Sequence, residues 1–407
     1  MFTPKYQLND RQMAVLLASL VAVMPFSVDA YLPSTLDIAK ALGAQTHDIE
    51  RSLSAFMLGV AIGQLSGGSL SDIKGRRNIA LKGLLVYVVS SLALVFVQTA
   101  DQLLLLRLVQ ALGAGMASVV VGAVVRDNYR GNQAAQMFAL IGIIMMAAPM
   151  LAPQLGALLN KIGGWRSVFA FLFVYGSAVA AALYAFLPQH KQPEKLKAAH
   201  LREVGGRYRH IVGCAPAMGV MFFQAASFAS MLVFLSESPA VYMEFYGLSS
   251  TQYALVFACN IFTMMCFNRI TAWRLKRGSH PRNILNFGIA LQLAANGSML
   301  LATLLTGGHP PLALLVLFVM VSVGTQGFVT ANTQALFMGY FKPEIGGGAS
   351  SLLSAFQSLV AACAGFAASK LHNGTPYVMA GMMLAMTVGG FALLSLLTPK
   401  QPENKAA

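Results

Sequence analysis

The segment GGSLSDIKGRRN, residues 67–78, is a polar stretch between two long apolar stretches. It holds one aspartate and three basic residues in a chain of 407 residues that is 57% hydrophobic and only 10% charged. Soluble domains carry about 25% charged residues. The composition therefore indicates a membrane protein, and the segment is predicted to be a turn between two membrane spans.

Twelve apolar segments of the sequence are long enough to cross a bilayer, which takes about 20 residues as a helix. The predicted spans are Met13–Leu32, Ile49–Leu70, Ile79–Val97, Gln102–Val124, Gln136–Leu158, Val168–Leu187, Val212–Leu235, Gln252–Ile270, Ile284–Leu305, Leu312–Asn332, Gly348–Leu371 and Pro376–Leu397. The longest polar stretch, 188–211, divides them into two equal sets. The sequence thus predicts an all-α membrane protein with two six-helix bundles, residues 1–187 and 212–407, joined by a cytoplasmic linker loop at 188–211.

The distribution of basic residues predicts the orientation in the membrane. A net charge of +14 could indicate a nucleic-acid partner, but the charges are spread over many short loops. With the N-terminus inside the cell, most of the 28 lysines and arginines fall on the cytoplasmic side, as the positive-inside rule requires. Those left outside are Lys40, Arg51, Lys161, Arg166 and Lys370. We expect an inner-membrane monomer with both termini cytoplasmic, surrounded by the lipid bilayer and without a nucleic-acid partner.

Two opposite charges lie inside predicted spans, where ionisable residues are costly and usually functional. Asp29 in span one and Arg107 in span four are predicted at similar depths, so that they could pair directly or through water. The alternatives are that Asp29 ends its span at the interface and that Arg107 extends its side chain to the membrane surface. Glu237 is expected at the interface beyond span seven. All seven histidines fall in predicted loops, which argues against a metal site or proton relay built on histidine within the membrane.

Each residue type in the polar segment has a predicted role. Gly68 allows close helix approach, and Gly75 supplies a tight turn. Arg76 and Arg77, with Lys74, are expected to anchor the turn at the inner leaflet. Asp72 at a helix C-terminus opposes the helix dipole, so it needs a partner. That partner is either a basic neighbour or the N-terminus of another helix, and we expect the start of span eleven, Gly346–Ala349, when the inner gate is closed.

The spacing of Gly68, Asp72, Gly75, Arg76 and Arg77 resembles the signature loop of the major facilitator superfamily. The chain departs from that motif at Ile73, where a basic residue is common. Span four, with Arg107-x-x-Gln110, resembles the motif of this family that has a buried arginine. Span five resembles the antiporter motif at Pro149, Pro153 and Gly156, although alanine replaces several glycines.

Four further segments resemble the Bcr/CflA family of drug-resistance exporters: DAYLPSTLDIA, GGWRSVF, SESPAVYMEFYGLS and GGGASSLLSAFQ. The resemblance implies a proton antiporter of twelve helices whose signature loop, residues 68–77, belongs to the cytoplasmic gate. We expect Asp29 to carry the coupling proton and Arg107 to tune it. The candidate substrate-binding residues are Tyr31, Met146, Gln224, Phe228, Asn260 and Gln357. The amide side chains among them could instead form interhelical hydrogen bonds.

Three functions fit the sequence to different degrees. The first is a proton-coupled exporter of small, largely apolar compounds, with no cofactor and no metal. The second is a proton-coupled transporter of a specific metabolite or siderophore, in either direction. The third, an intramembrane enzyme or a receptor, is disfavoured because the sequence shows neither a nucleophile with a base nor an added soluble domain. No nucleotide-binding GxxxxGK[ST] loop is present, so if transport is driven, we expect an ion gradient to supply the energy.

Overall fold

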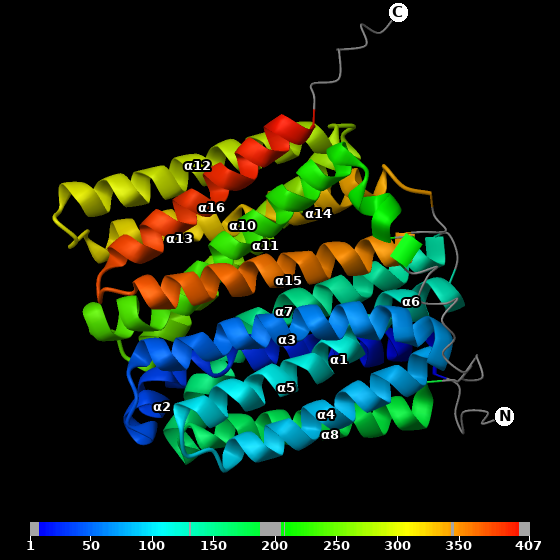
Figure 1. The fold of residues 1–407 in the computed structure, drawn as a ribbon, viewed down its shortest axis with the longest axis horizontal. Helices are drawn as coiled ribbons and strands as arrows, with labels where there is room; N and C mark the ends of the chain where they lie inside the picture. Colours follow the sequence, from blue (N-terminus) through cyan, green and yellow to red (C-terminus); the bar gives the residue numbers. More distant parts are fainter. Residues whose placement is uncertain (1–7, 130–131, 188–204, 207, 343–345, 399–407) are drawn as a thin grey trace, which may run out of the picture.

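The computed structural model describes residues 8–129, 132–187, 205–206, 208–342 and 346–398 as an assembly of helices packed side by side (Figure 1). The helices of the first half are α1 (Asp10–Asp29), η1 (Leu32–Ser34), α2 (Thr35–Leu42), α3 (Thr46–Lys74), α4 (Arg76–Val95), α5 (Ala100–Ser118), α6 (Val120–Asn128), α7 (Asn132–Gly163) and α8 (Arg166–Phe186). Those of the second half are α10 (Ala215–Pro239), η2 (Ala240–Phe245), α11 (Ser250–Lys276), α12 (Pro281–Leu305), α13 (Leu312–Gly324), α14 (Gln326–Met338), α15 (Gly346–Leu371) and α16 (Pro376–Leu397).

The prediction of twelve spans is confirmed, because twelve helices of the described chain are long and apolar enough to cross a membrane. Four of these spans are interrupted: α1 continues through η1 into α2, α5 into α6, α10 into η2, and α13 into α14. The start of α1 and the end of α16 lie at the same end of the bundle (Figure 1). We call this the motif end, because Lys74 of α3 lies there, and the opposite end, at Thr46, the far end. Residues 188–204 and 207 of the predicted linker lie outside the described residues.

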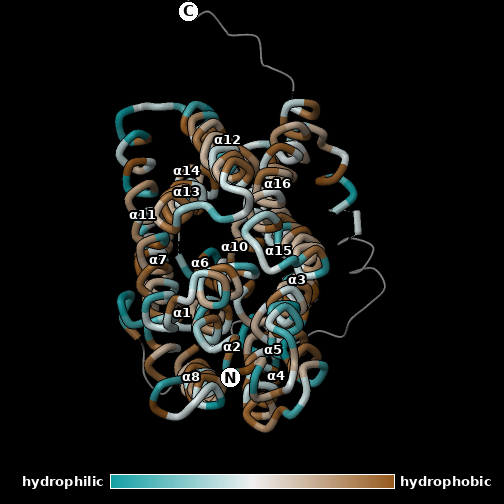
Figure 2. Tube along the Cα trace, turned by 90° about the vertical axis from the view of Figure 1, so that its left-hand side faces the viewer, coloured by the Kyte–Doolittle hydropathy of each residue, from teal (hydrophilic) through white to brown (hydrophobic). Residues whose placement is uncertain are grey.

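The two halves, α1–α8 and α10–α16, meet along two pairs of helices. On one side α3 packs against α15, and on the other α7 packs against α11 (Figure 2). Within the first half α3 packs most extensively against α5. Polar hydrogen bonds also join the halves, as Gln154 of α7 donates from Nε2 to the carbonyl oxygen of Ala254 in α11 at 2.6 Å.

Local sequence explains where several helices begin and end. Asn9 and Gln12 form a capping box at the start of α1, and Ser249 and Gln252 form another at α11. Gly75 separates α3 from α4 with φ of 88°, a left-handed conformation that favours glycine. The predicted tight turn at Gly75 is therefore confirmed. Gly68 lies directly against Ser351 of α15, so its predicted role in close packing is also confirmed.

Gly156 of α7 lies at a point where two helices almost touch. A Cβ atom there would overlap the backbone carbonyl oxygen of Ala30, directly after α1. The helix contains Pro149 and Pro153 and yet continues from Asn132 to Gly163, as prolines can do in membrane helices whose neighbours satisfy the freed backbone groups. Small residues at such crossings let the backbones of membrane helices pack closely.

We expect Gly156→Ala to destabilise the protein by about 1–3 kcal/mol, because the added methyl group must push α7 away from Ala30. Thermal unfolding of the purified full chain in detergent measures the effect. Gly142→Ala is the matched control on the same helix, because nothing lies within 4 Å of a Cβ at that position. Equal unfolding temperatures for the two variants would contradict the close contact.

Candidate functional site

The signature loop places its charges in a network at the motif end. Asp72, in the last turn of α3, forms an ion pair with Arg76 in the first turn of α4. Arg76 also contacts Asp127 of α6 at 3.2 Å and donates to the hydroxyl of Ser71 at 2.7 Å. Of the two kinds of partner predicted for Asp72, the structure shows the basic neighbour, Arg76. Contact with Gly346–Ala349 stays a prediction.

Arg77 does not have the predicted role of a lipid anchor. Its side chain is buried, donates from Nη2 to the carbonyl oxygen of Tyr184 at 2.5 Å, and lies 4.9 Å from the centre of that tyrosine's ring. Arg77 therefore ties α4 to α8. Arg76, engaged by two carboxylates, is likewise a structural part of the loop. Both corrections have one cause: acceptors on other helices are close enough to compete with lipid headgroups.

Arg107 on α5 is the largest fully buried charged side chain of the described residues, with 0% exposure. Its Nη1 donates to Gln110 Oε1 at 2.8 Å, and Gln110 in turn donates to Ser91 Oγ at 2.8 Å. The guanidinium carbon lies 4.5 Å from the ring centre of Tyr31 and 4.4 Å from that of Phe56. Two desolvated aromatic faces can each contribute about 2 kcal/mol to holding a cation. The aromatic faces and one amide thus stabilise this charge.

Asp29 ends α1 and is only 5% exposed. Among the described residues, no ion pair or hydrogen bond joins it to Arg107, so the predicted pair is not formed directly. Nε and Nη2 of Arg107 also have no hydrogen-bond partner in the described part of the chain. The first half therefore contains a buried acid and a buried base that remain separate.

The candidate substrate-binding residues differ in what surrounds them. Tyr31 covers Arg107, and Phe228 packs against the core. Gln224 donates to Gln357 at 3.1 Å, the interhelical hydrogen bond that the sequence left as the alternative. Asn260 on α11 is 0% exposed, and neither amide atom has a hydrogen-bond partner within the described residues. The side chain of Met146 lies outside the described part of the structure.

A third cluster, at the far end, was missed by sequence reasoning. Glu237 of α10 is 0% exposed, so its predicted interfacial position is wrong. The helix runs past the predicted end of span seven, to Pro239, and continues as a π-helical turn to Phe245, so Glu237 lies within the helix and not beyond its end. His372, in the loop after α15, approaches Glu237 Oε2 with its Nδ1 at 2.9 Å. This hydrogen bond raises the pKa of His372.

Glu50 in the first half completes this cluster. It is 2% exposed, and neither of its carboxylate oxygens has a hydrogen-bond partner in the described chain. One ligand atom each from Glu50, Glu237 and His372 lie within 4.8 Å of one another. His372 lies in a loop, as predicted, but its ring reaches a buried acid. Glu50 lies within the predicted span Ile49–Leu70. A charged residue inside a span was the sequence signal from which this cluster could have been found.

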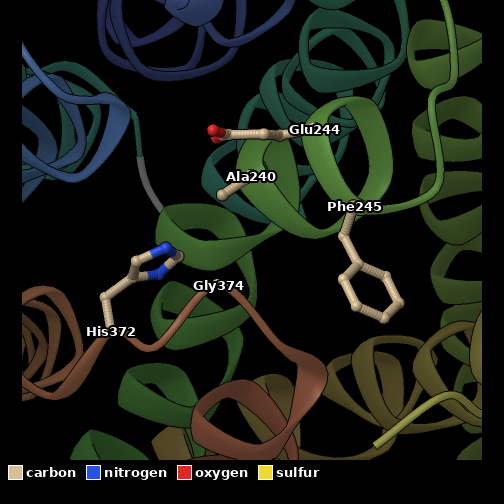
Figure 3. A pocket seen from close by; sticks show the side chains of 5 residues that line it. All are labelled: Ala240, Glu244, Phe245, His372 and Gly374. Atoms are coloured by element: carbon tan, nitrogen blue, oxygen red, sulfur yellow. The ribbon is translucent and has the colours of Figure 1, made fainter.

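Two further contacts surround the far-end cluster. The ring of His47, in the first turn of α3, stacks on His372 with ring centres 5.8 Å apart. Arg51 donates from Nε to Ser369 Oγ at 3.2 Å and contacts Asp48 at 3.0 Å. Beside His372 is a cavity of about 340 Å³ lined by Ala240, Glu244, Phe245, His372 and Gly374 (Figure 3).

We expect Arg107→Met to abolish transport while reducing stability by no more than about 1–3 kcal/mol. The variant leaves Gln110 without its donor, but it also removes a charge whose burial is costly. Substrate flux in vesicles and thermal unfolding in detergent measure the two effects. Arg166→Met, which removes an exposed arginine at the far end, is the control and should keep transport. Full transport by Arg107→Met would show that the buried cation has no function.

Comparison with solved structures supports the fold. The chain is similar to the xylose transporter XylE from E. coli in a partially occluded inward-open conformation, with a TM-score of 0.72, 14% identity, and coverage of 95% of this chain and 97% of that chain. A peptide transporter, POT, gives a TM-score of 0.73 at 14% identity over 96% and 97% of the two chains. Likeness at this level of identity establishes the arrangement of helices alone.

Known proteins with related sequences match between 70% and 94% of this chain. A bicyclomycin resistance protein homolog from Haemophilus influenzae is 28% identical over 92% of this chain and 91% of its own length. The multidrug resistance protein MdtL from Klebsiella pneumoniae is 27% identical over 94% of each chain. A chloramphenicol resistance protein from Pseudomonas aeruginosa is 31% identical over 70% of this chain and 68% of its own length.

The model of one family matches residues 15–365 and 220–407, which together cover nearly all of the sequence. The match agrees with the signature loop between α3 and α4, with the buried arginine of α5 and with the twelve membrane helices. The chain therefore belongs to the Major Facilitator Superfamily, a family of membrane transporters.

Proposed function

We propose that this transporter exports small, largely apolar compounds in exchange for protons, by alternating access between its two halves. The observation that carries the proposal is the carboxylate of Asp29, buried inside a membrane span without an ion-pair partner among the described residues. Ionisable residues within spans commonly mark ion and substrate pathways. The relatives named for resistance to bicyclomycin, to chloramphenicol and to several drugs support export as the direction.

The coupling step requires that Asp29 exchange one proton between the two sides. When the outer side is open, Asp29 takes up a proton from that side. When the inner side is open, the arriving substrate and the proton compete, so that the proton leaves as the substrate binds. Each occupant excludes the other, and this mutual exclusion is what antiport requires. The transporter then works as a single chain in the inner membrane.

Arg107 supports this step from a distance, through Tyr31. The ring of Tyr31 lies over the guanidinium, and Tyr31 follows the end of α1 by two residues. A change in position of Arg107 therefore moves the chain next to Asp29 and changes the electrostatic potential there. A nearby cation favours the charged form of an acid, whereas desolvation favours the neutral form. This balance would set the affinity of Asp29 for its proton.

Asn260 is the best candidate for a direct substrate contact. A buried amide whose donor and acceptor are both unsatisfied costs free energy unless a partner arrives. A substrate hydroxyl or carbonyl group would supply that partner. Gln224 donates to Gln357 and accepts from Thr333, so we assign Gln224 and Gln357 to helix packing.

We expect Asp29→Asn to abolish proton-driven transport without unfolding the protein, because the amide keeps the size of the carboxylate but cannot carry the proton. Transport is measured in inverted membrane vesicles against a panel of antibacterial compounds, siderophores and small metabolites. Asp101→Asn, at an exposed acid in the first turn of α5, is the matched control and should transport normally. Active concentration of a substrate by Asp29→Asn would refute the coupling role, and accumulation in intact cells rather than in inverted vesicles would indicate import.

Both termini are proposed to face the cytoplasm, which places the motif end inside the cell. The basic residues in the loops at the motif end support this orientation, because cytoplasmic loops carry an excess of lysine and arginine. A reporter enzyme that is active only outside the cytoplasm should therefore stay inactive when fused after the last residue. Activity of that reporter would reverse the topology, and with it the assignment of the two gates.

A further inference from the structure

The far-end cluster brings three metal-binding side chains together from both halves of the transporter. Glu50 comes from α3 in the first half, whereas Glu237 of α10 and His372 of the loop after α15 come from the second. Their ligand atoms lie within 4.8 Å of one another, although the residues are far apart in sequence. We propose that Glu50, Glu237 and His372 bind one divalent cation of the zinc type, which joins the two halves at the far end.

The unsatisfied charge of the cluster is the first argument for a metal. Glu50 and Glu237 are 2% and 0% exposed, and three of their four carboxylate oxygens have no hydrogen-bond partner in the described chain: Glu50 Oε1, Glu50 Oε2 and Glu237 Oε1. Buried charges are costly unless they are paired or coordinate metals. One divalent cation balances two carboxylates and supplies a binding partner to each of them.

The second argument is that the arginine next to Glu50 in the sequence is engaged by other residues. Arg51 follows Glu50 directly, but it contacts Asp48 at 3.0 Å and Ser369 at 3.2 Å. Among the described residues, no ion pair joins Arg51 to Glu50 or Glu237. In the part of the chain that the structure describes, His372 is the one basic group that pairs with either acid, and it pairs with Oε2 of Glu237.

The donor atoms select the class of metal. Two carboxylates and one imidazole form a ligand set that suits Zn²⁺, which takes nitrogen and oxygen donors at about 2.0–2.2 Å in a tetrahedral arrangement. Three protein ligands leave one position for water or another small ligand. The cavity of about 340 Å³ beside His372 provides that space and a path for entry, and Figure 3 shows Glu244 at its wall. The negative charge of Glu244 would attract a cation to this cavity.

A metal at this place would hold the far end closed. Bonds from one ion to α3 and to the second half must break before the halves can separate there. Alternating access needs such a separation in every cycle. Zn²⁺ should therefore stabilise the folded chain, and Zn²⁺ added on the far-end side of the membrane should inhibit transport. Neither effect depends on whether Asp29 carries a proton.

The test is Zn²⁺ binding to the purified full chain in detergent after removal of metals with a chelator. We expect one Zn²⁺ per chain by equilibrium dialysis, together with a rise in the thermal unfolding temperature. Glu50→Gln and His372→Gln should each weaken the affinity at least about tenfold, as loss of a metal-site group does. Binding to the unaltered protein is measured without substrate or proton gradient, so failure of the transport proposal leaves the result readable.

Two control variants separate this site from adventitious surface binding. His309→Gln removes an exposed histidine that stacks on Phe245 at the same end, and Asp101→Asn removes an exposed acid in the first turn of α5. Both should bind Zn²⁺ as the unaltered chain does. The proposal fails if the unaltered chain binds no Zn²⁺, or if binding is lost in Asp101→Asn and kept in Glu50→Gln. It also fails if acidic pH without Zn²⁺ raises the thermal unfolding temperature and Zn²⁺ does not, because a proton shared by Glu50 and Glu237 would then occupy the site.

Discussion

The cost of keeping charges away from water is the constraint on which this structure depends. The chain has few charged residues, and several of them are fully enclosed by helices: Asp29, Glu50, Arg107 and Glu237. Arg107 is stabilised by aromatic rings and an amide, and Glu237 by a histidine. Asp29 and Glu50 have no such partner in the described chain. A membrane transporter retains such groups where an ion is to be bound and released.

Helix α3 connects the two ends of the molecule. It carries Glu50 near its start and Asp72 in its last turn, and it packs on α5 within its own half and on α15 of the other half. Gly68 contacts Ser351 near the motif end, while Arg51 bonds to Ser369 at the far end. A rigid helix with cross-half contacts at both ends gives a direct mechanical route by which closure of one end can open the other. Alternating access in such transporters needs one end to close as the other opens, and α3 can connect the two movements.

Much of the fold and part of the site could be predicted from the sequence. Hydropathy is a property of each segment by itself, so the twelve spans and the turn at Gly75 followed from local composition and spacing. The small residues at Gly68 and Gly156 indicated close packing, and each does lie against a neighbouring helix. Asp29 and Arg107 each lie within an apolar segment long enough to span the membrane, which predicts that both charges are buried, and both are.

The tertiary structure alone decided which groups meet. Two charges at similar depth suggested a pair of Asp29 with Arg107, but depth says nothing about the direction in which each helix turns its side chain. Arg107 turns toward Tyr31 and Phe56, and Asp72 takes Arg76 from the next helix. Glu50, Glu237 and His372 meet because the start of α3 and the ends of α10 and α15 lie close together. The sequence determined which segments can span the membrane. The packing of the helices determined which side chains contact one another, since these contacts depend on the rotation and crossing of whole helices.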